Sequence, residues 1–178
     1  MIQGLVRLNN EQRCELMYFD ESGFSPNPPV QYGWAPIGQT RAVEPLAHRQ
    51  RVNVLGALHH SGALVWTAQQ RPTTRDDVTA FFDQLASQPH AVPRIILLDN
   101  AAIHKGHAME KNRRRWAKHG MYLYYLPPYS PELNRIEILW KNAKYFWRRY
   151  VALNGTDLVD EIVSLMKDFG KEFTINFA

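Results

Sequence analysis

The sequence predicts a single α/β domain over residues 1–178, with a mixed sheet flanked by helices. The length suits one domain with a sizeable core, and the content of 45% hydrophobic and 21% charged residues is that of an ordinary globular protein. A first strand is followed by a hairpin and then by a strand–helix–strand unit, which is the order of a mixed sheet. No apolar run approaches the ~18 residues that would span a membrane, so we expect no membrane association.

The first strand is predicted at Leu16–Phe19, a short apolar run that leads into a turn at Asp20–Gly23. Residues 1–15 are mostly polar and form a short lead-in that is too short to be a domain. Residues 25–45 are rich in Pro and Gly, which predicts irregular structure or a short edge strand.

A hairpin and a capped helix are expected next. Residues 51–58 and 64–68 are two strand-like runs on either side of a turn. Thr74 and Asp77 have the spacing of a capping box. The apolar residues that follow recur with helical spacing and predict an amphipathic helix: Val78, Phe81, Phe82 and Leu85.

The second half of the chain begins with another buried strand, Ile95–Leu98, which ends at Asp99. The basic segment 101–120 is expected to be helical and to be closed by its final glycine. Residues 122–126 predict a further strand, stopped by the two prolines that follow.

Two helices are expected at the end of the sequence. Ser130-Pro131-Glu132 combines a hydroxyl cap, a proline in the first turn and an acid near the positive end of the dipole, so a helix should run from there to about Tyr150. The last helix is expected at about 157–169, with Gly170 after it.

Two aspartates, Asp20 and Asp99, each follow a short apolar run. If these runs are neighbouring parallel strands, both carboxylates enter one crevice at the carboxyl end of the sheet. Aspartate also starts turns for local reasons, which is the simpler interpretation for either residue alone. The occurrence of two such acids in one small domain favours a shared site.

A third acid, Glu137, lies on the helix predicted from Ser130. The apolar stripe of that helix should pack against the sheet: Leu133, Ile136, Trp140, Ala143, Trp147 and Tyr150. Glu137 lies at the edge of this stripe. Three cations continue along the same edge: Lys141, Lys144 and Arg148. A plain i, i+4 ion pair between Glu137 and Lys141, worth about 0.2–0.5 kcal/mol, would explain part of the same pattern.

Three carboxylates with cations beside them suit the cleavage of a phosphodiester. Carboxylate oxygens are preferred ligands of Mg²⁺ and Mn²⁺. Two such ions about 3.5–4 Å apart stabilise both the attacking and the leaving oxygen. Nearby cations would hold a DNA backbone, which the formal net charge of +4 also suits.

Three motifs resemble the mariner superfamily of DDE transposases, and its bacterial insertion-sequence branch most of all. They are Asp20-Glu21-Ser22, Leu98-Asp99-Asn100-Ala101 with His104, and the block LPPYSPELNRIE from Leu126 to Glu137. The proline-rich block is the specific part, and the resemblance covers nearly the whole chain from about Leu16. Between Asp99 and Glu137 lie 37 residues, a spacing within the range of the superfamily.

This resemblance implies a ribonuclease-H-like fold in which Asp20, Asp99 and Glu137 are the catalytic, metal-binding triad. It implies nicking at transposon ends and attack of the freed 3′-hydroxyl on target DNA, with two Mg²⁺ or Mn²⁺ ions. Double-stranded DNA would be the partner, and we expect a homodimer in the active complex. Such transposases usually carry helix-turn-helix domains before the first aspartate, so we expect that region to be separate or missing.

Several further residues are candidates. Glu132 competes with Glu137 as the third acid, although in a first helical turn an acid acts by dipole and capping alone. Asn100 and His104 are candidates for contacts beside the metal ligands, but Asn100 would also suit a helix cap and His104 a surface role. Arg135 stands where the family commonly has proline. The predicted DNA-binding residues are Lys105, Arg113, Arg114, Arg135, Lys141, Lys144 and Arg148.

Two alternative functions stay open at this point. A ribonuclease-H-like nuclease would cut DNA without joining it, and an inactive or repurposed transposase fragment would bind DNA without cutting it. The single cysteine, Cys14, excludes a disulfide within the chain and favours a reducing compartment. We therefore expect a cytoplasmic protein that associates with the nucleoid when it binds DNA.

Overall fold

The computed structural model describes residues 2–25, 37, 51–101, 107–128, 130–150 and 158–171, with the backbone alone for 107–108 and 146–150. The strands are β1 (Glu15–Phe24), β2 (Val52–His59), β3 (Leu64–Gln69), β4 (Arg94–Leu98) and β5 (Met121–Tyr125). The helices are α1 (Ile2–Asn10), α2 (Arg75–Ser87), α3 (His107–Lys118), α4 (Ile136–Tyr150) and α5 (Leu158–Asp168), with a 3-10 turn at Pro131–Leu133. The irregular region predicted at 25–45 lies almost wholly outside the described residues.

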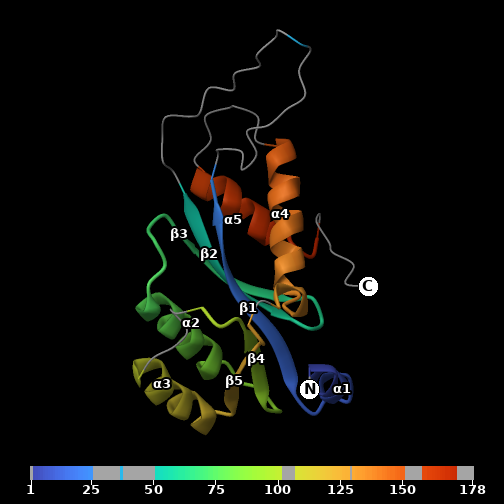
Figure 1. The fold of residues 1–178 in the computed structure, drawn as a ribbon, viewed down its shortest axis with the longest axis vertical. Coiled ribbons are helices and arrows are strands. Elements are labelled where there is room, and N and C mark those ends of the chain that lie inside the picture. Colours follow the sequence, from blue (N-terminus) through green and yellow to red (C-terminus); the bar gives the residue numbers. More distant parts are fainter. Residues whose placement is uncertain are drawn as a thin grey trace.

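The strands form one mixed sheet in the order β3-β2-β1-β4-β5. Strands β1, β2 and β3 are antiparallel neighbours, whereas β4 runs parallel to β1 and β5 runs parallel to β4. The predicted hairpin and the predicted strand–helix–strand unit are therefore both confirmed. The central strand β1 carries the first aspartate and touches both halves of the sheet (Figure 1).

Helices cover both faces of the sheet. Side chains alternate along each strand, so each face carries apolar residues that a helix layer can bury. Leu16, Tyr18 and Phe24 of β1 belong to the core beneath α4 and α5. Met17 and Phe19 point the other way, into the core beneath α2 and α3. Figure 1 shows α2 and α3 grouped together, with α4 on the opposite side of β1. The predicted α/β class, a mixed sheet flanked by helices, is confirmed.

The predicted helix signals of α2 and α3 are confirmed in their local chemistry. The Thr74 hydroxyl accepts a hydrogen bond from the Asp77 backbone N–H at 3.3 Å, and the Asp77 carboxylate accepts from the Thr74 N–H at 2.8 Å. Gly120, just beyond α3, has a φ of +76°, a conformation that glycine adopts without strain. The described part of α3 spans His107–Lys118, and residues 102–106 of the predicted helical segment lie outside the described residues.

Strand β1 is longer than predicted, so the expectation that Asp20 ends a strand was wrong. Asp20 pairs with Gly56, and the ladder with β2 continues to Phe24. The antiparallel partner supplies backbone hydrogen bonds along this polar stretch, which the apolar pattern of β1 alone does not reveal. Strand β4, by contrast, does end immediately before Asp99.

The predicted helix start at Ser130 was also wrong. The Ser130 side chain makes no capping hydrogen bond, residues 131–133 form a 3-10 turn, and α4 begins at Ile136. Asn134 has an extended backbone, with φ −98° and ψ 96°, and its side chain bonds to β1 rather than to the turn. A long-range hydrogen bond therefore overrides the local signal for a helix start.

The N-terminal helix α1 was not predicted, because the sequence indicated only a short lead-in. Ile2, Leu5 and Val6 pack against the core beneath α4 and α5. The part of the chain that the structure describes contains no helix with enough length and apolar character to cross a membrane.

Candidate active site

Asp20 and Asp99 are brought side by side by the pairing of β1 with β4. The two strands are parallel neighbours, and Tyr18 stands opposite Leu97. Two residues further along each chain, Asp20 and Asp99 lie at the same level of the sheet. Because side chains alternate, Asp20 shares the face of Tyr18, which is the face beneath α4. The predicted arrangement of neighbouring parallel strands is confirmed.

Glu137 lies in the first turn of α4, which is anchored on the same face of the sheet. Among the described side chains of this helix, the buried ones are Ile136, Leu139, Trp140 and Ala143. The Trp140 ring lies directly on Gly56, where an added Cβ would stand 2.7 Å from the ring. Gly56 is the direct neighbour of Asp20 on β2. The absence of a side chain at 56 therefore lets α4 approach the sheet beside Asp20.

The three predicted acids line one cavity of about 340 Å³, which we call the polar cavity. The residues that line it are Asp20, Glu21, Ser22, Gly23, Arg51, Asp99, Ala101, Glu137, Trp140 and Lys144. Glu132, the alternative third acid, lies exposed in the 3-10 turn and is not among them. The geometry favours Glu137 over Glu132.

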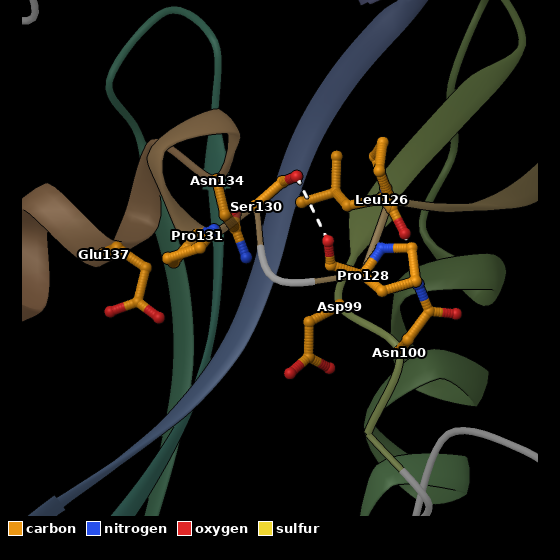
Figure 2. A pocket seen from close by; sticks show the side chains of 9 residues that line it. Asp99, Asn100, Leu126, Pro128, Ser130, Pro131, Asn134 and Glu137 are labelled. Atoms are coloured by element: carbon orange, nitrogen blue, oxygen red, sulfur yellow. Dashed lines mark hydrogen bonds between the residues drawn. The ribbon is translucent and has the colours of Figure 1, made fainter.

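A second cavity, of about 480 Å³, adjoins the first and shares Asp99 and Glu137 with it. We call it the proline cavity, because its walls are Asp99, Asn100, Leu126, Pro127, Pro128, Ser130, Pro131, Asn134 and Glu137. Figure 2 shows Asp99 and Glu137 on two sides of it. Asp99 and Glu137 thus lie between the polar cavity and the proline cavity.

The pKa of Asp20 is raised, in part by the nearby acids. Burial, followed by the negative charge of Glu137, raises the pKa of Asp20 to about 7. Asp99 and Glu21 raise it further, while a hydrogen bond from the Glu21 backbone acts in the opposite direction. Like charges held together in this way disfavour ionisation, and a bound cation would relieve that repulsion.

The donor set fits a hard divalent cation. Asp20, Asp99 and Glu137 offer carboxylate oxygens to a common cavity, and such oxygens are the ligands that Mg²⁺ and Mn²⁺ prefer. Among the described residues, no group of three His, Cys, Asp or Glu side chains is already spaced to hold an ion. The carboxylates surround the cavity rather than converge on a point.

Two asparagines tie the loops of the site to the sheet. Asn134 donates a 3.0 Å hydrogen bond to the carbonyl oxygen of Phe19, and the Asn100 amide donates to the carbonyl oxygen of Leu126. The alternative role of Asn100 as a helix cap stays a prediction, because residues 102–106 between it and α3 lie outside the described residues. The Asp99 carboxylate itself accepts a 3.0 Å hydrogen bond from the Ala101 N–H.

Two cations of the described residues line the polar cavity with the acids, and the sequence pointed to one of them. Lys144 of α4 was predicted, and its ammonium group lies 5.8 Å from the centre of the Phe24 ring. Arg51 was missed, because it follows a Pro- and Gly-rich stretch with no recognisable motif. Its guanidinium lies so close over Gly23 that a Cβ there would collide with it.

The other predicted DNA-binding residues lie away from the two cavities or outside the described residues. The Arg135 guanidinium is 2.9 Å from Nδ1 of His60 and lies over the Tyr18 ring at 5.9 Å. Lys141 is exposed on α4. Lys105 and His104 lie outside the described residues, as does the side chain of Arg148.

The two predicted arginines of α3 lie in the layer on the opposite face of the sheet. Arg113 forms a 2.8 Å ion pair with Glu110, and its guanidinium lies over the Tyr125 ring. Arg114 is largely exposed and 3.8 Å from the same glutamate. The structure therefore brings Lys144 and Arg51 to the acids, and leaves these two arginines apart from them.

A mixed sheet between helices, with a trio of acids at one cavity, is an arrangement that suits a nuclease core. Residues 15–157 match the family model described as DDE superfamily endonuclease. The chain belongs to this family, and the resemblance noted in the sequence is confirmed. No curated protein sequence matches the chain.

Solved structures show the same fold. The match with the Mos1 strand transfer complex covers 96% of this chain and 50% of the Mos1 chain, at 15% sequence identity and a TM-score of 0.64. The match with the Mos1 mariner paired end complex with Mn covers 95% of this chain and 52% of the Mos1 chain, at 14% sequence identity and a TM-score of 0.62. The catalytic core domain of BIV integrase matches 90% and 86%, at 16% identity and a TM-score of 0.54.

These neighbours are ribonuclease-H-like catalytic cores of transposases and integrases, and the predicted fold is confirmed. The chain spans about half the length of the Mos1 chains. The HTLV-2 integrase core, with a TM-score of 0.54 and 11% identity, was solved with magnesium, and one Mos1 complex contains Mn. The solved structures that share this fold therefore include complexes with divalent metal ions.

Proposed function

We propose that this chain is the catalytic part of a transposase, which cuts DNA at transposon ends and joins the freed 3′-hydroxyl to target DNA. The observation that carries the proposal is the shared cavity of Asp20, Asp99 and Glu137 in a chain of the DDE endonuclease family. The Mos1 neighbours, a strand transfer complex and a paired end complex, support the joining step over cutting alone.

The three carboxylates are proposed to hold two Mg²⁺ or Mn²⁺ ions. Bound there, the ions supply positive charge to the attacking and leaving oxygens of the phosphodiester. Asp20 belongs to the central strand, Asp99 follows the neighbouring strand and Glu137 lies on α4, so a rigid framework positions each carboxylate. Precise placement of the reacting groups is the main contribution of the protein in such chemistry.

The cations of the polar cavity are proposed to orient the DNA backbone. Arg51 and Lys144 line the cavity that holds the acids, so a phosphate held by them would lie beside the carboxylates. Guanidinium and ammonium groups are the usual partners of DNA phosphates. Outside the cavity, we propose further backbone contacts from Lys105, Arg113, Arg114, Arg135, Lys141 and Arg148.

Two features of the complete assembly are also proposed. The active complex is a homodimer, because transposition must handle two transposon ends together. Recognition of those ends is assigned to a helix-turn-helix region that is separate or missing, and the match covers about half of each Mos1 chain.

The test is a pair of assays with Mn²⁺: nicking of supercoiled plasmid, and joining of an oligonucleotide with a free 3′-hydroxyl to a second duplex. Asp20→Asn, Asp99→Asn and Glu137→Gln should each abolish both activities, whereas the matched control Glu132→Gln should retain them. Loss in Glu132→Gln with activity in Glu137→Gln would reassign the third ligand. Nicking without joining would favour the nuclease alternative, and DNA binding without either would favour the inactive fragment.

A further inference from the structure

The proline cavity is not explained by metal binding. It adjoins the acids through Asp99 and Glu137, and its volume of about 480 Å³ lies within the range of small-ligand sites. Leu126, Pro127, Pro128 and Pro131 give it apolar walls. A DNA strand whose phosphate lies at the acids must continue on both sides of them, so this cavity lies on one path of the strand.

The two cavities differ in charge. Arg51 and Lys144 line the polar cavity, whereas the described residues that line the proline cavity include no Lys or Arg. The charges at its rim are those of Asp99 and Glu137. A phosphate group would be repelled there, so the part of a nucleotide that fits is the uncharged one, the base with its sugar.

Asn134 lines the proline cavity and carries a buried hydrogen-bond acceptor. Asn134 is only 3% exposed, and its Nδ2 is committed to the carbonyl oxygen of Phe19. Its Oδ1 is buried and has no hydrogen-bond partner in the described part of the chain. A buried acceptor left unsatisfied costs about 1–3 kcal/mol, so a ligand with an N–H donor would be favoured at this position.

Two polar side chains nearby each commit one donor inside the protein. The Asn100 amide bonds to the carbonyl oxygen of Leu126, and the Ser130 hydroxyl donates to the carbonyl oxygen of Pro128 at 3.4 Å (Figure 2). The carboxylates of Asp99 and Glu137 and the amide oxygens of Asn100 and Asn134 supply acceptors among the residues that line the cavity. A nucleobase with an amino group supplies the complementary donor.

We infer that the proline cavity binds one deoxynucleoside of the DNA strand, adjacent to the phosphate held at the acids. Its base packs between the proline rings and Leu126 and donates an N–H to Oδ1 of Asn134. This inference rests on the proposed function, since it assigns a further part of the same substrate to the same site.

The test compares two short single strands of equal length and charge, one of deoxycytidine and one of abasic deoxyribose. The wild-type protein should bind the deoxycytidine strand more tightly, by about fivefold or more if one buried hydrogen bond is gained. Ser130→Trp, which fills the proline cavity, should remove the preference. The matched control Ser87→Trp fills a separate groove between α2 and α3 and should leave the preference intact.

A second measurement does not depend on variants. Photocrosslinking with 5-iododeoxycytidine strands, followed by peptide mapping, should place an adduct within residues 126–134. Adducts confined to α3, or equal affinity for both strands in the wild-type protein, would overturn the inference. If neither strand binds and Mn²⁺-dependent nicking is also absent, the proposed function itself fails, whereas nicking without a base preference overturns this inference alone.

Discussion

The side-chain amide of Asn134 donates a 3.0 Å hydrogen bond to the carbonyl oxygen of Phe19, the residue immediately before Asp20. The backbone of Asn134 in turn accepts a 2.9 Å hydrogen bond from the N–H of Glu137. Two hydrogen bonds thus connect the strand that carries the first acid with the helix turn that carries the third. The relative position of Asp20 and Glu137 depends on this connection.

Asn134→Ala should lower the free energy of unfolding by about 1–3 kcal/mol, because the buried carbonyl of Phe19 loses its donor. Urea denaturation measures this loss. The control is Asn142→Ala, whose amide bonds to the Ile138 carbonyl on the exposed side of α4, and its change should stay within about 0.5 kcal/mol. Equal losses in the two variants would contradict a special role for Asn134.

Asp20→Asn should stabilise the metal-free protein near pH 7.5. The pKa of Asp20 is raised in the folded state to about 7, above its ordinary value, so the folded state binds this proton more tightly than the unfolded state. Stability is therefore fully present below about pH 4 and is lost as the pH rises towards 7. Removing the charge should add about 1–2 kcal/mol at pH 7.5 and little at pH 4.

Addition of Mn²⁺ provides the complementary experiment. Mn²⁺ should raise the melting temperature of the wild-type protein, since binding to the folded state alone is stabilising. The increase should disappear in Asp20→Asn and persist in Asp76→Asn, a change on the exposed first turn of α2. An equal Mn²⁺ response in both variants would remove Asp20 from the proposed ligands.

Arg51→Ala and Lys144→Ala should each weaken DNA binding and flatten its dependence on salt. Each lost phosphate contact should reduce the slope of log affinity against log salt by about 0.9. Fluorescence anisotropy over a salt series measures the slope. Lys167→Ala on α5, away from both cavities, should leave it unchanged. An unaltered slope in Arg51→Ala would show that this side chain does not contact phosphate.

Gly56→Ala should destabilise the protein by about 1–3 kcal/mol, because the new methyl group would overlap the Trp140 ring. It should also reduce nicking, since displacing α4 moves Glu137 away from Asp20. Thermal unfolding and the plasmid assay together test this. Gly4→Ala is the control: its added Cβ meets nothing within 4 Å, so α1 should be unaffected or slightly stabilised.

The sequence by itself determined the class of the fold and nominated the three acids. Apolar periodicity and turn residues located all five strands and the helices α2, α3 and α5, because these signals depend on short stretches of chain. The short runs before Asp20 and Asp99, with the proline-rich block before Glu137, were enough to nominate the trio that lines the polar cavity.

The tertiary structure decided what depends on contacts between distant residues. The length of β1 follows from its ladder with β2, and the start of α4 follows from the bond between Asn134 and Phe19. Arg51 reaches the acids because Gly23 leaves room for its guanidinium. No local pattern encodes such pairings, since they form only when segments far apart in the sequence pack together.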